Sequence, residues 1–140
     1  MKEIKLKSNI SYDFSLLGIT SSLQDYKMAW LINNSLKIHL SKCSDHIVEY
    51  DEIKKIEVSC FQYNNHGTLI KCLRNKVYKE NGQPQEYLVP EHKHFDFFLL
   101  LEGQDIDVTN LTNKLKQING LEFITTIDIM KMKSRENFIL

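Results

Sequence analysis

The chain has 140 residues, 42% of them hydrophobic and 10% aromatic, which suits a single domain whose core needs neither a disulfide nor a metal. Eighteen basic residues balance eighteen acidic ones, so the usual electrostatic footprint of a nucleic-acid-binding protein is missing. The apolar run at 97–101 is far too short to span a bilayer.

The first residues have no apolar region of signal-peptide length. Three cysteines (Cys43, Cys60 and Cys72) are an odd number at no zinc-like spacing. Together these features favour a protein of the reducing cytoplasm with no membrane association.

The amino-terminal part is expected to hold one strand and one helix. Residues 2–7 alternate between apolar and charged side chains, which predicts a short strand suited to a sheet edge. Residues 12–36 are predicted to be mainly helical, and the ambiguous apolar stretch 12–18 is compatible with one helical turn. Ser22 and Asp25 have the spacing of a capping box.

The expected core face of this helix is formed by Leu23, Tyr26, Trp30 and Asn33, which recur at helical spacing. Trp30 is the only tryptophan, and we expect it to be a core anchor.

From residue 37 onward the period changes to two, which predicts strands. Segments 37–40 and 46–50 are weak strands, and 55–63 is a stronger one. The turn residues of 64–67 predict a hairpin whose second strand is 68–73, with Cys60 roughly opposite Cys72. We expect both thiols to be reduced and packed. Residues 79–84 include Asn-Gly and predict a second turn.

The carboxyl-terminal part gives the clearest pattern. Segment 95–101 predicts a strand covered on both faces. An apolar stripe then predicts a helix over 108–118 with Asp107 as N-cap, and a further strand follows over 121–129. The last residues, Phe138 to Leu140, indicate a terminus that docks on the domain.

These elements predict a single α+β domain comprising residues 1–140. Its mainly antiparallel sheet is built largely from 46–101 and 121–129 and is covered by helices at 22–35 and 108–118. The carboxyl-terminal strand–helix–strand unit is like half of a ferredoxin-like or ACT-like arrangement.

The polar residues best suited to carry chemistry gather just before the apolar run. Glu91, His92, His94 and Asp96 include potential metal ligands and a potential base, although no fourth ligand follows at a recognisable spacing. Solvated loop histidines are the default interpretation. Asp96 lies inside the apolar run, so it must be hydrogen-bonded, ion-paired or exposed at the mouth of the strand. One interpretation is a carboxylate that caps backbone amides of a neighbouring loop, and another is a functional carboxylate with Glu91 as its partner. Two further interpretations of Glu91 are an ion pair with a lysine and the capping of a helix.

The segment Val89-Pro90-Glu91, three residues, then Phe95-Asp96-Phe97 resembles the signature of the IPExxxVDY family of small bacterial proteins of unknown function. Val89 stands where the signature has isoleucine, Phe95 where it has valine, and Phe97 where it has tyrosine. Any role of the tyrosine hydroxyl in the family therefore does not apply to this chain. Similar flanking residues extend the resemblance over nearly the whole chain. It implies a single-domain bacterial protein, with Pro90, Glu91 and Asp96 as the matched positions.

Glycine-rich phosphate loops and nucleophile elbows are absent from the sequence. The leading hypothesis is therefore a non-enzymatic interaction module that self-associates or binds a protein partner and needs no cofactor. The alternative is a small-ligand sensor with a pocket near Pro90–Asp96. A metal-dependent or acid/base enzyme that uses the same polar cluster is less favoured.

Overall fold

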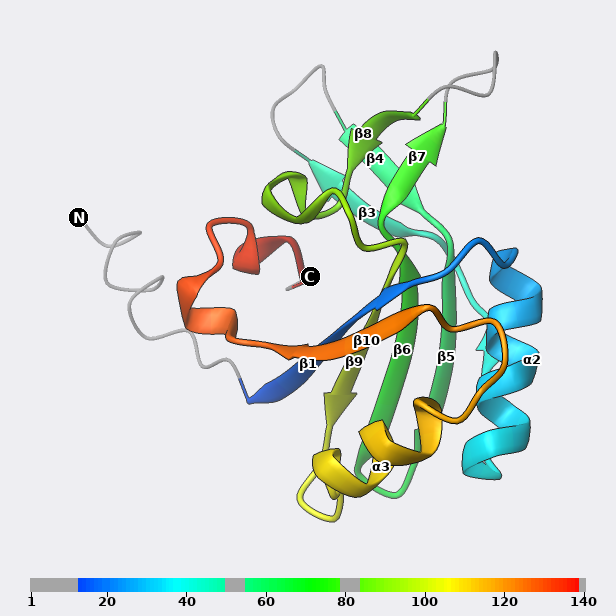
Figure 1. Cartoon of the computed structure of the whole chain (residues 1–140). Coiled ribbons are helices and arrows are strands. Elements are labelled where there is room, and N and C mark those ends of the chain that lie inside the picture. The colour runs from blue at the N-terminus through cyan, green and yellow to red at the C-terminus, as the bar shows by residue number, and fades with distance from the viewer. Residues whose placement is uncertain (1–12, 50–54, 79–83, 139–140) are drawn as a thin grey trace.

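The computed structural model describes residues 13–49, 55–78 and 84–138 as one α+β unit (Figure 1). Its main sheet has six strands: β1 (Phe14–Thr20), β2 (Ser41–Lys42), β5 (Cys60–Asn65), β6 (Thr68–Arg74), β9 (Phe97–Glu102) and β10 (Phe123–Ile127). Two short hairpins, β3 (His46–Glu49) with β4 (Lys55–Val58) and β7 (Lys76–Tyr78) with β8 (Pro84–Tyr87), lie beyond one end of it. The helices are α2 (Asp25–Leu36) and α3 (Val108–Leu115).

The strand order is β10-β1-β9-β6-β5-β2, and every neighbouring pair is antiparallel. Strands β9 and β10 are therefore parallel to each other, with β1 between them and α3 as their connection. Strands β1 and β6 are related in the same way across β9, with α2 in the connection. The order of β10, β1, β9 and β6 is that of a ferredoxin-like sheet, but here the connection from β1 to β6 also contains β2, β3, β4 and β5.

The α+β class, the two helices and the carboxyl-terminal strand–helix–strand unit were predicted and are confirmed. The expected sheet composition was wrong in part, because β1 and β2 join the main sheet, whereas β3–β4 and β7–β8 form separate two-stranded sheets. The predicted strand at 2–7 and the Asn-Gly turn at 81–82 lie outside the described residues.

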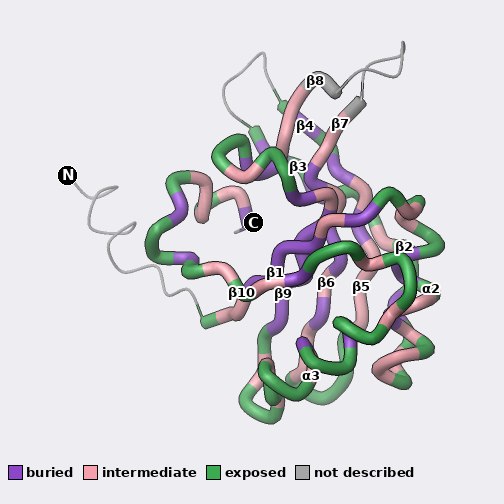
Figure 2. Tube along the Cα trace, in the orientation of Figure 1, coloured by how far each residue is buried: buried purple, intermediate pink, exposed green. Residues whose placement is uncertain are grey.

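Buried residues run along the central strands of the main sheet (Figure 2), and they divide into two hydrophobic cores. One core lies under α2 and α3 and includes Met28, Ile32 and Leu115. The other contains Val58 from the β3–β4 hairpin and Phe138 from the carboxyl-terminal segment. Strand β9 contributes alternate residues to both cores, and all five of its apolar residues are at most 4% exposed. The predicted strand with two covered faces is thus confirmed.

Strand β1 replaces the helical turn expected around residues 12–18. Its apolar residues alternate between the cores, with Leu16 in one and Leu17 in the other. Gly18, at the middle of the strand, pairs with Phe98 of β9. A Cβ atom at Gly18 would lie 2.8 Å from three ring atoms of Phe95, so the ring lies directly on this glycine. Glycine within a strand often marks such a close approach.

Helix α2 has a different buried face from the one predicted. Met28, Ala29 and Ile32 face the sheet, whereas Tyr26 and Trp30 are 67% and 58% exposed. The expected core anchor Trp30 is therefore a surface residue, with the ammonium of Lys27 4.7 Å from its ring. The capping box was also wrong, because the N-cap is Gln24 and makes no side-chain cap hydrogen bond.

The β5–β6 hairpin is confirmed. Asn65 pairs with Thr68, and the two turn residues between them, His66 and Gly67, both have positive φ, as in a type I′ turn. The register pairs Cys72 with Phe61, so Cys72 and Cys60 point into opposite cores. Burial raises the pKa of each of these two thiols to about 12, so both are protonated at neutral pH.

The carboxyl-terminal segment docks as predicted, as far as Phe138. It contains the 3₁₀ helices η2 (Ile129–Lys131) and η3 (Arg135–Phe138), and Phe138 is buried against Phe98. His46 is also buried there, and its Nε2 contacts the backbone oxygen of Asn137. Its Nδ1 has no hydrogen-bond partner among the described residues. Burial lowers the pKa of His46, and the Asn137 carbonyl offsets only part of that effect.

Substitution of Gly18 by alanine should lower the free energy of unfolding by about 1–3 kcal/mol, because the new methyl group overlaps the Phe95 ring. Urea denaturation of Gly18→Ala, Phe95→Leu and the double variant forms a thermodynamic cycle. If the overlap is the cause, the double variant loses less stability than the sum of the two single losses. Strictly additive losses would contradict this packing.

Stability should fall as the pH drops below about 6.5, because unfolded His46 binds a proton more readily than the buried ring does. The His46→Gln variant should show a smaller fall than the natural protein when urea denaturation is compared at neutral and mildly acidic pH. His39→Gln, at an exposed position, serves as the control and should retain the full pH dependence. An unchanged slope in His46→Gln would refute the assignment.

Candidate functional site

Segment 88–96, which holds every site residue predicted from the sequence, is fixed by Asn75. This residue joins β6 to β7 and is fully buried. Its side-chain Nδ2 donates to the carbonyls of His92 (2.9 Å) and Phe95 (2.8 Å), and its Oδ1 accepts from the N–H of Val89 (2.8 Å). Its backbone N–H donates to the carbonyl of Asp96 and its backbone oxygen accepts from Leu88. All the hydrogen-bonding groups of this amide side chain are thereby used within the protein.

Pro90 and Glu91 have structural roles in this arrangement. Pro90 begins the 3₁₀ helix η1 (Pro90–His92), where its missing N–H costs nothing. The Glu91 carboxylate accepts from the backbone N–H of Ser134 (2.8 Å) and from its hydroxyl (2.6 Å). Burial by itself raises the pKa of Glu91, but these hydrogen bonds outweigh it and lower that pKa overall. Glu91 therefore caps the start of η3 and holds the carboxyl-terminal segment.

Asp96 lies at the entry to β9 and caps the neighbouring loop, as one of the sequence interpretations anticipated. Its Oδ2 accepts from the backbone N–H of Ser21 (2.8 Å). Its Oδ1 forms an ion pair with the Lys76 ammonium (2.7 Å), and the two side chains are only 21% and 22% exposed. A partly buried, hydrogen-bonded pair of this kind keeps a fixed geometry better than a surface ion pair does.

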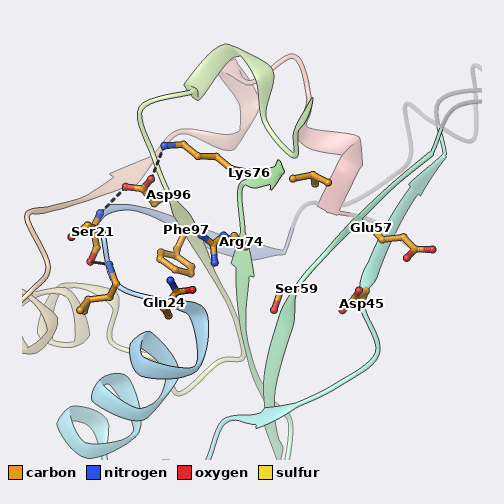
Figure 3. Close-up of a pocket in the computed structure, with 12 residues that line it drawn as sticks. Ser21, Gln24, Asp45, Glu57, Ser59, Arg74, Lys76, Asp96 and Phe97 are labelled. Atoms are coloured by element: carbon orange, nitrogen blue, oxygen red, sulfur yellow. Dashed lines mark hydrogen bonds and ion pairs between the residues drawn. The ribbon is translucent and has the colours of Figure 1, made fainter. Parts of the chain in front are cut away.

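Asp96 also lines a pocket of about 770 Å³ (Figure 3). The pocket is bounded by the loop before α2, the β2–β3 connection, strand β4, the β6–β7 junction and the start of β9 with the preceding Asp96. Its polar lining residues are Ser21, Ser22, Gln24, Asp45, Glu57, Ser59, Arg74, Lys76 and Asp96. Of segment 90–96 only Asp96 reaches it, so the structure does not bring Glu91 and Asp96 together in this pocket.

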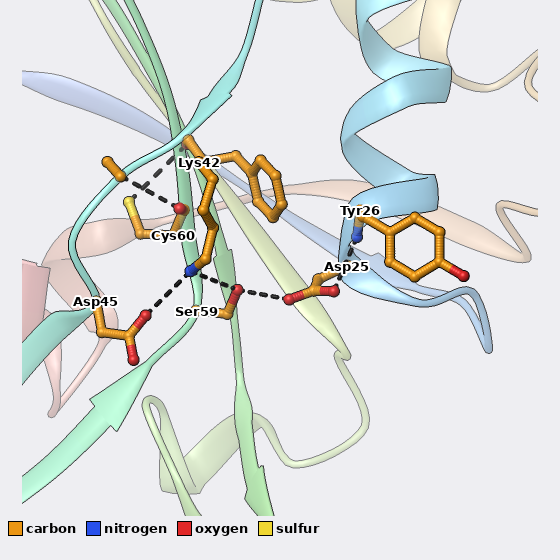
Figure 4. A network of polar contacts seen from close by, with 8 residues as sticks. Asp25, Tyr26, Lys42, Asp45, Ser59 and Cys60 are labelled. Carbon is orange, nitrogen blue, oxygen red and sulfur yellow. Dashed lines mark hydrogen bonds and ion pairs between the residues drawn. The ribbon is translucent and has the colours of Figure 1, made fainter.

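A polar network supports one wall of the pocket (Figure 4). The Ser59 hydroxyl, between β4 and β5, donates to the Asp25 carboxylate (2.6 Å) at the start of α2. The Lys42 ammonium donates to Ser59 Oγ (3.3 Å) and to Asp45 (3.0 Å). Burial raises the pKa of Asp25, but hydrogen bonds from Ser59 and Tyr26, together with Arg74 and Lys42 nearby, lower it overall. Asp25 is thus an anion at neutral pH that ties α2 to the sheet.

The two histidines do not form a metal site with their neighbours. Because η1 is helical, His92, His94 and Asp96 do not alternate as they would in an extended strand. The rings of His92 and His94 instead pack near Phe95, with centroids 5.6 and 4.1 Å from it. In the described part of the chain, no three His, Cys, Asp or Glu side chains are placed to hold a metal ion.

Sequence reasoning missed Arg74, Lys76 and Ser59 as site residues. Arg74 ends β6 and Lys76 begins β7, and both side chains line the pocket. The guanidinium carbon of Arg74 lies 5.8 Å from the centre of the Phe97 ring, within the range of a cation–π contact. The sequence does show a cation on each side of Asn75, but the residues that these cations contact come from distant segments and could not be predicted.

No protein-family model matches the chain, and no curated protein or solved structure shows significant similarity to it. No helix in the described residues is long and apolar enough to cross a membrane.

Replacement of Asn75 by alanine should lower the free energy of unfolding by about 3 kcal/mol or more, because the buried Phe95 carbonyl and the buried Val89 N–H lose their partner. Asn113→Ala, at an exposed position of α3, is the matched control and should change stability by less than about 0.5 kcal/mol. Chemical denaturation measures both. Equal small effects would show that the amide does not fix the segment.

Proposed function

We propose that this protein is a non-enzymatic small-ligand-binding domain whose site is the pocket beside Asp96. The observation that carries the proposal is the pocket itself, because about 770 Å³ lies within the range of roughly 300–1,000 Å³ common for small-molecule sites. Hydroxyl, amide and charged groups converge on it from five segments of the chain.

The ordering of these groups supports binding more than it supports catalysis. Asp96 is held by Ser21 and Lys76, and Ser59 is held by Asp25 and Lys42. Such positions are fixed before a ligand arrives, which reduces the entropy lost on binding. The lowered pKa of Asp25 makes it a weak base for activating Ser59. The resemblance to the IPExxxVDY family supplies no activity and is compatible with this proposal.

A panel of carboxylates, phosphate esters, amines, amino acids and sugars should contain a compound that raises the melting temperature. A ligand present at about 100 times its Kd adds roughly 2.7 kcal/mol of stability. The rise should disappear in Arg74→Gln and persist in Lys114→Gln, an exposed cation on α3. A panel without any Arg74-dependent rise would overturn the proposal.

Self-association, the leading hypothesis from the sequence, is a second candidate because of the edge strand β10. This strand ends the main sheet on one side, and no strand among the described residues pairs with its outer edge. Its sequence, FITTI, contains neither a charge nor a proline, the usual protections of an edge. Phe123 beside this edge is 53% exposed. Antiparallel pairing of β10 with β10 of a second copy would give the outer backbone N–H and C=O groups of both strands hydrogen-bond partners.

Light scattering over a dilution series tests this second candidate. The natural chain should form a dimer that dissociates on dilution, and Thr126→Lys should shift it to monomer by adding charge at an exposed edge position. Lys133→Glu, at an exposed position of the carboxyl-terminal segment, controls for a general charge effect and should leave the dimer intact. A monomer at every concentration would eliminate self-association.

A further inference from the structure

The charges of the pocket are separated into two groups. Arg74 and Lys76 lie along the β6–β7 junction, with Asp96 next to Lys76. Asp45 and Glu57 come from the β3–β4 hairpin and its approach, and Figure 3 shows them together on the other side of the pocket. Ser59 lies between the two groups: it shares Lys42 with Asp45, and its carbonyl accepts from the N–H of Arg74.

We propose, on the basis of the ligand-binding function above, that the pocket takes a small zwitterion of about dipeptide size. Its carboxylate lies at Arg74 and its ammonium lies at Asp45 and Glu57. The planar fork of N–H donors on a guanidinium matches a carboxylate in shape and charge. A cation–π contact with the Phe97 ring helps to hold the Arg74 guanidinium at the pocket.

The acidic side is suited to an incoming ammonium. Asp45 and Glu57 are 45% and 49% exposed, and their present partners are the exposed lysines Lys42 and Lys55. Exposed ion pairs of this kind contribute little free energy, so exchanging a lysine for a ligand ammonium costs little. The Lys76–Asp96 pair, by contrast, is more deeply placed and remains as part of the wall.

The balance of charge argues against ligands of a single sign. Among the described residues, the lining contains two basic side chains, Arg74 and Lys76, and three acidic ones, Asp45, Glu57 and Asp96. A purely anionic ligand would be repelled by the carboxylates, and a purely cationic ligand would be repelled at Arg74. A ligand with both charges meets a complementary group at each end, and the volume of about 770 Å³ accommodates more than a single amino acid.

Three matched forms of a dipeptide test the inference by isothermal titration calorimetry. The forms are free alanylalanine, its N-acetyl derivative without the ammonium, and its amide without the carboxylate, with a second set built on serylleucine. The free form of at least one set should bind about 10-fold or more tightly than either blocked form, the loss expected for one charge-assisted contact.

Variants assign each end of the ligand. Arg74→Gln should reduce the ratio of the affinity for the free dipeptide to the affinity for its amide. The double variant Asp45→Asn with Glu57→Gln should reduce the ratio of the affinity for the free dipeptide to the affinity for its N-acetyl form. Melting curves without ligand establish that the variants are folded, and Lys114→Gln should behave as the natural protein. Blocked forms that bind as well as the free form, or a uniform loss for all three forms in Arg74→Gln, would overturn the assignment.

Failure of this inference is distinguishable from failure of ligand binding itself. If no dipeptide binds but a phosphate ester, amine or sugar raises the melting temperature in an Arg74-dependent way, the zwitterion is wrong and the pocket still binds a ligand. If neither the dipeptides nor the broader panel bind, both proposals fail.

Discussion

The hydrogen bonds of the buried Asn75 are the interactions on which the position of the 88–96 segment depends. Asn75 joins the end of β6 to the segment that leads into β9, and it does so through five hydrogen bonds made by its backbone and side chain. Its neighbours on either side, Arg74 and Lys76, both line the pocket. The residue that fixes the 88–96 segment is thus flanked by two cations of the pocket. A structural requirement and a candidate binding function share one short stretch of sequence.

The parts of the fold that could be predicted from the sequence are those with a local cause. Strand β9 has five successive apolar residues, and a six-residue strand inside a sheet buries them on both faces. The β5–β6 hairpin follows from turn residues that tolerate positive φ, and α3 follows from its apolar stripe and from Asp107, whose side chain accepts from the N–H of Asn110. In each case the decisive residues lie within one element.

The errors have a non-local cause. In α2, the Tyr26–Trp30 spacing and the Met28–Ile32 spacing are equally helical, and only the position of the sheet decides which side is buried. Strand β1 has a glycine where the ring of Phe95, far along the chain, must fit. For the site, a carboxylate inside an apolar run correctly singled out Asp96. Its partner Lys76 is twenty positions away and is brought to it by strand pairing, which no local pattern reports.

The carboxyl-terminal segment has a consequence for the order in which the fold is completed. Phe98 belongs to the middle of the sheet, yet one of the rings that covers it, Phe138, comes from a segment much later in the chain. Until this segment docks, one face of the sheet is incompletely covered and large apolar side chains are in contact with water. A partly folded chain of this kind exposes the type of surface that chaperones bind.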